Sequence, residues 1–574
     1  MKTRILILLL AAMLLFSACG KTAAPAETAK ETEPAAAETP PSETSPPETP
    51  PPETDLTGAY YLNAAGEAIL DDAYFSSAAA AEDNYRVFYE IFVGSFSDSD
   101  GDGTGDLRGV INRMDYLNDG DPHSGCSLGV EGIWLTPVFP SGSYHKYDVN
   151  NYYGIDPAFG TLDDLKELVA LCHERGVKLI LDLPINHTGP LCEWFGSFRR
   201  AHREGDTASP YYDFYCWYGP GDDAPAGRHF APISGTQDYY ECNFSGDMPE
   251  LDFDNPAVRE TVLDVAKFWM DLGVDGFRFD AAKYVYLGEN QRSAEFWQWY
   301  AGELRKLNPE VYLVGEVWDS DGITDIYYSA MNCFDFTTSQ TEGLISATAK
   351  KGNVNAYTSY VDKYLDTVRA INPDAMIVPF IANHDTDRAA GYLTVTSGHM
   401  QMAANLYLLS SGSPFIYYGE ELGMRGSRGG ASTDANRRLA MVWGDGDTVK
   451  DPVGTDYPAS KQVEETVADQ RADGGSLLSY YKKLIAIRQA NPEIARGDYT
   501  ALPFTDTRLG GFTASWNGNT VCVLHNTTGS AAEIDLSTVT DLEFRTIAAV
   551  IGMEDAELNG TTVRLGSQTS VVLR

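Results

Sequence analysis

The sequence predicts an α/β protein built on a barrel of eight parallel strands. Eight short apolar runs, each bounded by turn residues, follow one another between Val87 and Tyr418. Helical patterns with a period of about 3.6 residues lie between many of these runs. Polar and charged residues follow several of the runs directly. Strand followed by helix, repeated along the chain, implies a parallel sheet with crossover helices, and eight such units fit a (β/α)8 TIM barrel.

The elements follow from local patterns in chain order. The predicted strands are Val87–Val93, Gly132–Thr136, Val177–Leu183, Val274–Phe279, Val311–Val314, Cys333–Phe336, Met376–Ile381 and Pro414–Tyr418. Amphipathic spacing predicts helices over Leu162–Arg175, Val258–Leu272, Ala294–Leu307, His399–Leu409 and Leu477–Ala490. Gly176, Gly273 and Asn308-Pro309 follow three of them, and such residues commonly end helices.

Composition and charge limit the classes of function. The chain has 574 residues, of which 43% are hydrophobic, enough to form a deep core. It carries 42 Lys and Arg against 82 Asp and Glu, a net charge of −40. A surface this acidic repels phosphate backbones, so we expect no nucleic-acid partner. The charge fits a neutral or cation-assisted substrate, and solubility alone would explain it equally well. We expect a monomer.

The N-terminal region has the pattern of a targeting segment. Lys2 and Arg4 precede an apolar run that is too short to span a bilayer comfortably and has the layout of a secretion signal. The run ends in small residues before Cys19, which resembles a bacterial lipoprotein processing site. We therefore expect residues 1–19 to be a lipoprotein signal peptide with lipidation at Cys19. The alternative is an ordinary signal peptide with an incidental cysteine.

The composition of the segment after Cys19 predicts a linker between a lipid anchor and the folded protein. Residues 20–57 are mostly Ala, Pro, Glu and Thr and should form a disordered linker. The predicted location is the extracellular face of the bacterial cell membrane, to which the lipid would anchor the chain. Residues 58–84 have no assignment. The cysteines show no metal-binding spacing, and the nearby Cys192, Cys216 and Cys242 are either partly bridged or free thiols.

Charged side chains follow four of the predicted strands. They are His187 after the third strand, Arg278, Asp280 and Lys283 around the end of the fourth, Glu316 after the fifth, and His384, Asp385 and Arg388 after the seventh. The carboxyl ends of barrel strands meet at one mouth, so these residues should form one site. One such residue alone could be a solvated rim group, but this explanation fits four strands poorly.

Three carboxylates with an arginine and two histidines suit glycoside hydrolysis with retention. That reaction needs an ionised carboxylate as nucleophile and a protonated one as acid and then base, about 5 Å apart. Arg278 lies two residues before Asp280, so both side chains point to one face, and the cation keeps Asp280 ionised. Glu316, two residues before Trp318, is the candidate for the raised pKa of a general acid.

The four segments together resemble the signature regions of the α-amylase family, glycoside hydrolase family 13. The similarity runs from about residue 85 to 492. It implies a catalytic barrel at 85–187 and 256–495, an inserted domain B at 188–255 and a C-terminal antiparallel β-sandwich at 496–574. The long gap between His187 and Val274 independently indicates an insertion after the third strand.

The resemblance also implies roles for individual residues. Asp280 would be the nucleophile, Glu316 the acid/base and Asp385 the stabiliser of the transition state. The residues implied to bind substrate are Tyr147, Asp148, His187, Arg278, Lys283, His384 and Arg388. Lys146 stands in the Tyr147 loop where the family pattern has glycine.

An acidic loop follows the first strand. It places oxygen atoms on alternate residues, as a hard cation such as Ca²⁺ requires, at Asp98, Asp100, Asp102, Thr104 and Asp106. Without a cation, the turn would crowd four carboxylates. The same loop binds calcium in one branch of the resembled family, so we expect Ca²⁺ as a cofactor.

The resemblance ranks three readings of function. The segment 248–252 is similar to that of a subgroup between oligo-1,6-glucosidases and neopullulanases. Ala281 and Lys283 resemble α-1,4-cleaving amylases, which favours an endo-acting α-amylase on starch or maltooligosaccharides. An α-glucosidase, neopullulanase or α-glucanotransferase is the alternative, because residues matching Asp148 and Arg388 pair in exo-acting relatives and close the cleft. A non-catalytic glycan-binding surface protein is a third reading, opposed by the intact carboxylates.

Overall fold

The computed structural model describes residues 83–429 and 433–574. The predicted signal peptide with Cys19, the linker and nearly all of the 58–84 extension lie outside these ranges. Within them, no helix combines the length and apolar character that crossing a membrane requires.

Eight parallel strands form the barrel, each within a few residues of its predicted place. They are β1 (Phe88–Ile91), β2 (Gly132–Leu135), β3 (Lys178–Asp182), β7 (Gly276–Phe279), β8 (Tyr312–Gly315), β9 (Asn332–Phe334), β10 (Ile377–Val378) and β11 (Phe415–Tyr417). Their order in the sheet is β10-β9-β8-β7-β3-β2-β1-β11. A parallel bridge between Phe380 and Phe415 joins the two ends of the sheet. The predicted (β/α)8 barrel is therefore confirmed.

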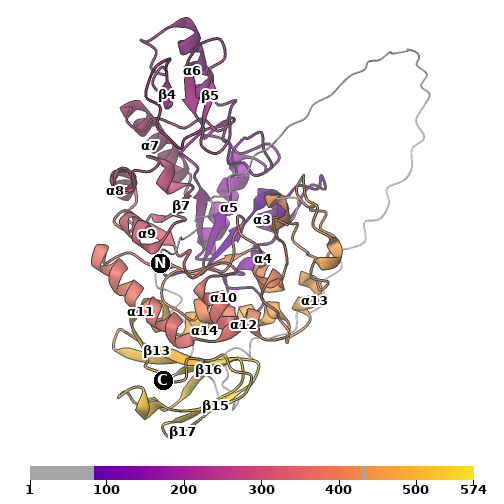
Figure 1. The fold of residues 1–574 in the computed structure, drawn as a ribbon. Coiled ribbons are helices and arrows are strands. Elements are labelled where there is room, and N and C mark those ends of the chain that lie inside the picture. The colour runs from indigo at the N-terminus through magenta and orange to yellow at the C-terminus, as the bar shows by residue number, and fades with distance from the viewer. Residues whose placement is uncertain (1–82, 430–432) are drawn as a thin grey trace, which may run out of the picture. The chain divides into compact units, whose positions relative to one another are not determined.

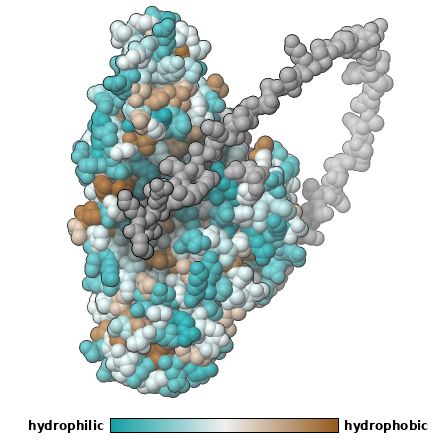
Figure 2. All heavy atoms as spheres, viewed as in Figure 1, coloured by the Kyte–Doolittle hydropathy of each residue, from teal (hydrophilic) through white to brown (hydrophobic). Residues whose placement is uncertain are grey.

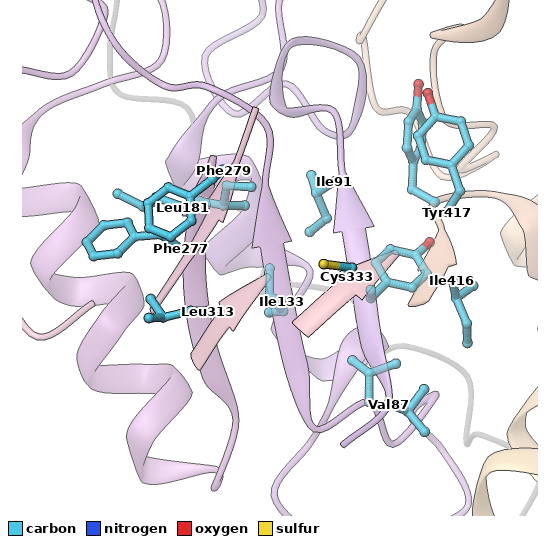
Figure 3. Packing of buried hydrophobic residues seen from close by; sticks show 14 of the residues in the cluster. Val87, Ile91, Ile133, Leu181, Phe277, Phe279, Leu313, Cys333, Ile416 and Tyr417 are labelled. Carbon is cyan, nitrogen blue, oxygen red and sulfur yellow. The ribbon is translucent and has the colours of Figure 1, made fainter. Parts of the chain in front are cut away.

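Alternate residues of the strands build two separate cores. Inward side chains such as Phe88, Trp134 and Phe415 fill the barrel, where the rings of Phe88 and Phe415 stack 4.7 Å apart. Outward side chains such as Ile133 belong to a larger core beneath the helices, and Figure 3 shows part of it. This alternation follows from the two-residue period of a strand. Because the barrel interior is packed, a binding site can form only at its mouth.

Helices connect and cover the strands (Figure 1). The longer ones are α5 (Leu162–Glu174), α7 (Pro256–Asp271), α8 (Asn290–Leu307), α10 (Leu344–Lys351), α11 (Val354–Ile371), α12 (His399–Leu408) and α14 (Leu477–Ala490). Shorter ones are α3 (Leu107–Asn112), α4 (Met114–Leu117), α9 (Asp321–Tyr327), α13 (Val467–Arg471) and α15 (Glu493–Arg496). Thr161 and Asp164 form a capping box that starts α5. The five predicted helices are present, while α10 and α11 were not predicted.

The segment between β3 and α7 forms a small unit of its own. It contains α6 (Glu193–Glu204) and a sheet of β4 (Trp217–Tyr218), β6 (Tyr239–Glu241) and β5 (Phe230–Pro232). Trp194 stacks on Tyr152, and Trp217 packs edge-on against His202. These aromatic residues therefore stabilise the insertion and its junction with the barrel. Cys192, Cys216 and Cys242 are free thiols, so the free-thiol alternative holds for the three in this segment.

The C-terminal region is an antiparallel β-sandwich, as expected. One sheet has the order β12 (Asp498–Ala501), β13 (Leu509–Trp516), β14 (Asn519–Asn526), β19 (Thr569–Leu573) and β16 (Ile547–Gly552). The other contains β15 (Ala532–Asp535), β18 (Thr562–Leu565) and β17 (Ala556–Asn559). A separate apolar cluster that includes Leu524 and Leu565 joins them. Polar residues dominate the visible surface of the described chain (Figure 2), in keeping with its net charge.

Candidate active site

The carboxyl ends of the strands surround a cleft of about 850 Å³. Three of the four charged strand ends bring their carboxylates, Asp280, Glu316 and Asp385, to its wall. Further lining residues are Tyr144, His145, Tyr147, His187, Phe244, Met248, Lys283, Tyr284, Trp318, Asp434 and Arg438. The insertion contributes only a few of these, Phe244 among them. The predicted catalytic residues therefore lie together in one open cleft.

Arg278 joins the carboxylates of three neighbouring strands. Its Nη1 donates to Asp280 at 2.6 Å and to both oxygens of Asp182 at 2.9 and 3.0 Å. Its Nη2 lies 3.2 Å from Glu316. The guanidinium is fully buried, so these ion pairs are shielded from water. Asp280 and Glu316 thus contact the same cation from neighbouring strands.

The environment of Glu316 favours its protonated form. Burial raises the pKa of Glu316 above its ordinary value, and the charges of Asp280 and Asp385 add to this effect against the opposing Arg278. The backbone N–H of Ala281 donates to Glu316 Oε2 at 2.9 Å, which orients the carboxyl group and partly opposes the rise of its pKa. Ala281 has a left-handed backbone with φ of 49°, a strained conformation that aims this N–H at the carboxyl group. The side chain is therefore suited to act as a general acid.

Asp385 is held in the opposite state. Burial disfavours its charge, but His384 and Arg438 hold the pKa of Asp385 well below its ordinary value. His384 Nε2 lies 3.0 Å from Asp385 Oδ2, and Arg438 Nη2 donates to Asp385 Oδ1 at 2.7 Å. The cleft therefore combines one carboxyl group whose pKa is raised with one whose pKa is lowered.

The predicted sugar-binding residues of the cleft differ in how they are engaged. Burial lowers the pKa of His187 to about 4, so its ring is neutral, and Nε2 has no partner within the described ranges. Tyr147 donates to Asp182 at 2.8 Å, and its ring lies at 12° to that of His384. Lys283 donates to the Trp318 carbonyl at 2.7 Å, which ties the two sides of the cleft wall together. His187 Nε2 is thus a buried ring nitrogen in the cleft wall without a hydrogen-bond partner in the described residues.

Two predicted substrate-binding residues do not line the cleft. Asp148 is buried and accepts hydrogen bonds from Ser141 at 2.5 Å and from Ser143. Arg388 is buried as well, and its guanidinium donates to the carbonyls of Tyr418 and Arg437 at 2.6 and 2.9 Å. No ion pair joins Asp148 and Arg388 in the part of the chain that the structure covers.

Lys146 occupies a backbone position that favours glycine. Its φ is 67°, in the left-handed region, which explains why the family pattern has glycine here. Lys146 Nζ pairs with Asp156 at 2.7 Å, and both side chains are nearly buried. This ion pair links the Tyr147 loop to Asp156.

Other site residues escaped the sequence prediction. A charged residue at the end of a buried strand, as Asp182 is, could have been recognised from the sequence. Its ion pair with Arg278 could not, because the pair depends on the register of two strands. Arg438 follows β11 in a loop without periodicity, so no local pattern pointed to it. Phe244 lies in the insertion among many aromatic residues that do not reach the cleft.

The acidic loop after β1 brings part of the predicted metal set together. Carboxylate oxygens of Asp98, Asp100 and Asp106 all lie within 4.8 Å of one another. Calcium binds oxygen at 2.3–2.6 Å, so ligands on opposite sides of one ion are separated by about 5 Å. Asp102 lies outside this group, and its carboxylate accepts a hydrogen bond from the Thr104 backbone N–H at 2.6 Å. The loop is thus an acidic cluster whose spacing fits one hard cation.

Comparison with known proteins identifies the family. The model described as "Alpha amylase, catalytic domain" matches residues 90–497, which run from within β1 through the other barrel strands and include the residues that line the cleft. The chain belongs to the α-amylase family. It is therefore a glycoside hydrolase of a family that acts on α-glucan substrates.

Members of the α-amylase family with different names resemble this chain. Alpha-amylase 3 of Dictyoglomus thermophilum is 34% identical over 77% of this chain and 84% of its own length. A cyclomaltodextrinase of Thermoanaerobacter pseudethanolicus is 28% identical over 82% of this chain and 71% of its own. Neopullulanase 2 of Thermoactinomyces vulgaris is 31% identical over 72% of this chain and 63% of its own length. Among solved structures, Eubacterium rectale Amy13B has a TM-score of 0.78 and 32% identity, covering 86% of this chain and 96% of its own.

Proposed function

We propose that this member of the α-amylase family is a retaining, endo-acting α-amylase that hydrolyses α-1,4-glucosidic bonds of starch and maltooligosaccharides. The observation that carries the endo reading is that no ion pair joins Asp148 and Arg388 in the described residues. Asp148 accepts from Ser141 and Ser143, and Arg388 donates to the carbonyls of Tyr418 and Arg437, so this pair does not close the end of the cleft. A cleft without that closure admits the interior of a chain. The similarity to Alpha-amylase 3 supports the same reading.

The proposed reaction gives each of the three carboxylates a separate role. Asp280 attacks the anomeric carbon while Glu316 gives its proton to the glycosidic oxygen, so the bond to the leaving sugar breaks and a glycosyl-enzyme ester forms. A water molecule then attacks that ester, Glu316 takes its proton, and Asp280 leaves. Asp385, ionised beside two cations, stabilises the positive charge that develops on the sugar ring.

The second candidate function is transfer of a glucan to an acceptor sugar, as in an α-glucanotransferase. An α-glucosidase or a neopullulanase would use the same catalytic residues. The Trp318 ring lines the cleft beside Glu316 with 41% of the residue exposed, and it stacks on Phe336 at 4.9 Å. A fixed, exposed indole beside the acid/base offers a surface on which an acceptor sugar can displace water. A non-catalytic glycan binder is the least supported reading, because all three carboxylates have the environments that the reaction needs.

A time course on amylose tests the proposal directly. Protein lacking residues 1–57 is incubated with amylose and calcium, and iodine colour and released sugars are followed together. Rapid colour loss with oligosaccharides of mixed length is expected. Slow colour loss with glucose alone would replace the endo reading with an α-glucosidase. Products longer than the substrate, seen with maltooligosaccharides, would favour transfer, and binding without products would favour a glycan-binding protein.

We also propose that the acidic loop holds one Ca²⁺ through Asp98, Asp100 and Asp106, with Asp102 and Thr104 supplying further oxygens of the same turn. Because the ion would bind only the folded loop, its removal by a chelator is expected to lower the melting temperature by several degrees. Differential scanning calorimetry with and without calcium measures this shift.

A pair of variants controls the calcium prediction. Replacing Asp98 and Asp100 with Asn should remove the response to calcium. Asp163→Asn removes a charge whose side chain is 90% exposed on α5, and it should leave the response intact. An unchanged melting temperature of the wild-type protein after chelation would refute the calcium site.

We further propose that Cys19 is lipidated and anchors the enzyme outside a bacterial cell membrane. The apolar run ending in small residues before Cys19 supports this proposal. Cys19→Ala is expected to move the activity from the membrane fraction to the medium. Wild-type protein already found in the medium would oppose the anchor.

A further inference from the structure

Glu90 is a buried carboxylate in the middle of the first barrel strand. It is 1% exposed and alternates with Phe88, so its side chain points inward on the same face. A buried charge is costly unless it is paired and hydrogen-bonded. Glu90 Oε1 accepts from His384 Nδ1 at 2.5 Å and from the His384 backbone N–H at 3.3 Å. Two contacts from one residue therefore account for a glutamate at this place.

The other ring nitrogen of His384 faces the cleft residues. His384 Nε2 lies 2.7 Å from the Tyr147 hydroxyl and 3.0 Å from Asp385 Oδ2. The Tyr147 hydroxyl gives its proton to Asp182, so its oxygen accepts from Nε2. Both ring nitrogens therefore act as donors, which is possible only for the imidazolium. In agreement, Asp385 and then Glu90 raise the pKa of His384 to about 10, against the effect of burial.

We propose that Glu90 is a positioning residue of the reaction, which holds His384 as a cation that donates from both nitrogens and thereby orients Asp385 and Tyr147. The role of these two in turnover rests on the proposed glycoside hydrolysis. The pairing of Glu90 with His384 does not, because it exists without a substrate.

The charges around His384 show why a carboxylate is needed at this position. The ionisable groups that contact it or interact with its charge are Glu90 from β1, Tyr147 from the loop after β2, Asp182 from β3, and Asp385 and Arg438 at the cleft. Arg438, whose Nε donates to the His384 carbonyl at 3.0 Å, opposes a further positive charge. Asp385 must leave its charge available to the sugar, so Glu90 is the carboxylate committed to the imidazolium alone.

The carboxylate also fixes the direction of the ring. A histidine with one nitrogen bound to a carboxylate is held in a single orientation, and its other nitrogen is presented as a donor. The edge-on contact of Trp134 with the His384 ring, at 5.6 Å, leaves little room for a different pose. With glutamine at position 90, the imidazole would lose one charged partner, and its neutral form would place a proton on only one nitrogen.

Glu90→Gln tests the proposal, read by NMR of protein labelled with ¹³C at histidine Cε1. The chain has nine histidines, and the His384 signal is assigned by its loss in His384→Gln. In the wild type, this signal should stay that of an imidazolium from pH 6 to 9. In Glu90→Gln, its pKa should fall by about one to two units. The kcat on a maltooligosaccharide should fall roughly 10- to 100-fold, with a smaller change in KM.

Glu421→Gln is the matched control. Glu421 is equally buried after β11, but its carboxylate accepts from the hydroxyls of Tyr89 and Tyr116. Its replacement should leave the His384 titration unchanged, whatever happens to stability. A change of the same size in this variant would mean that any buried charge affects His384, and it would overturn the proposal.

Two further outcomes would overturn the assignment. One is an unshifted His384 titration in folded Glu90→Gln; the other is a lower melting temperature with wild-type kcat. If Glu90→Gln does not fold, Glu90→Asp replaces it, because the shorter side chain draws the carboxylate away from Nδ1. An unshifted His384 pKa in Glu90→Asp would then be decisive against the proposal. The titration needs no substrate, so a failure of the proposed enzyme activity would leave it interpretable.

Discussion

Asp280→Asn is expected to lower kcat on amylose by about 10⁴-fold or more while the protein stays folded. In the wild-type protein Arg278 Nη1 donates to the Asp280 carboxylate at 2.6 Å. The amide of Asn has about the same volume, and its oxygen can accept the same hydrogen bond. An amide does not displace the leaving sugar, however, so the covalent intermediate cannot form. Steady-state kinetics with calorimetry of the same sample separates lost chemistry from lost structure.

A matched variant and an added nucleophile sharpen this prediction. Asp335 also follows a barrel strand and is buried, but it accepts from Tyr360 at 3.2 Å and does not line the cleft. Asp335→Asn should keep most of the activity. In Asp280→Ala, azide can enter from the vacated face and yield a glycosyl azide of inverted configuration. More than a few per cent of wild-type hydrolysis in Asp280→Asn would remove this residue from the role of nucleophile.

Glu316→Gln is expected to have the second largest effect, about 10³-fold on amylose, because the leaving oxygen is no longer protonated. A substrate with a nitrophenol leaving group needs no such proton, so its first step should be nearly unaffected and only the later attack by water should slow. Burst kinetics with a nitrophenyl maltooligosaccharide measures the two steps separately.

The pH profile gives an independent check on Glu316. Its pKa is raised, so the protonated form needed for the first step persists to a higher pH than for an ordinary glutamate and is lost as pH rises through that value. The wild-type rate should therefore fall on the alkaline side, and this limb should vanish in Glu316→Gln. Equal losses on amylose and on the activated substrate, with the alkaline limb retained, would assign the acid role to another group.

Elements with a strong local pattern were predictable from the sequence. The strands were found because each is a short apolar run between turn residues, and α14 was predicted with its observed bounds. α11 was missed although it is 18 residues long. Its buried face is built partly from tyrosine and threonine, such as Tyr357 and Thr358, which resemble strand residues as much as helix residues. Its neighbours in the fold, rather than its composition, make it a helix.

The sequence by itself determined the barrel and the position of each carboxylate at a strand end, because side-chain alternation and parallel topology carry those residues to one mouth. Tertiary structure alone decided their partners. Glu90 meets His384 across 294 residues, and Arg438 reaches Asp385 from a loop after another strand. Asp148 accepts from Ser141 and Ser143, and Arg388 donates to the carbonyls of Tyr418 and Arg437, so in the described residues the two form no ion pair. Local periodicity sets which face a residue lies on, but a charge pair depends on the path of two distant segments, which only the packed fold brings together.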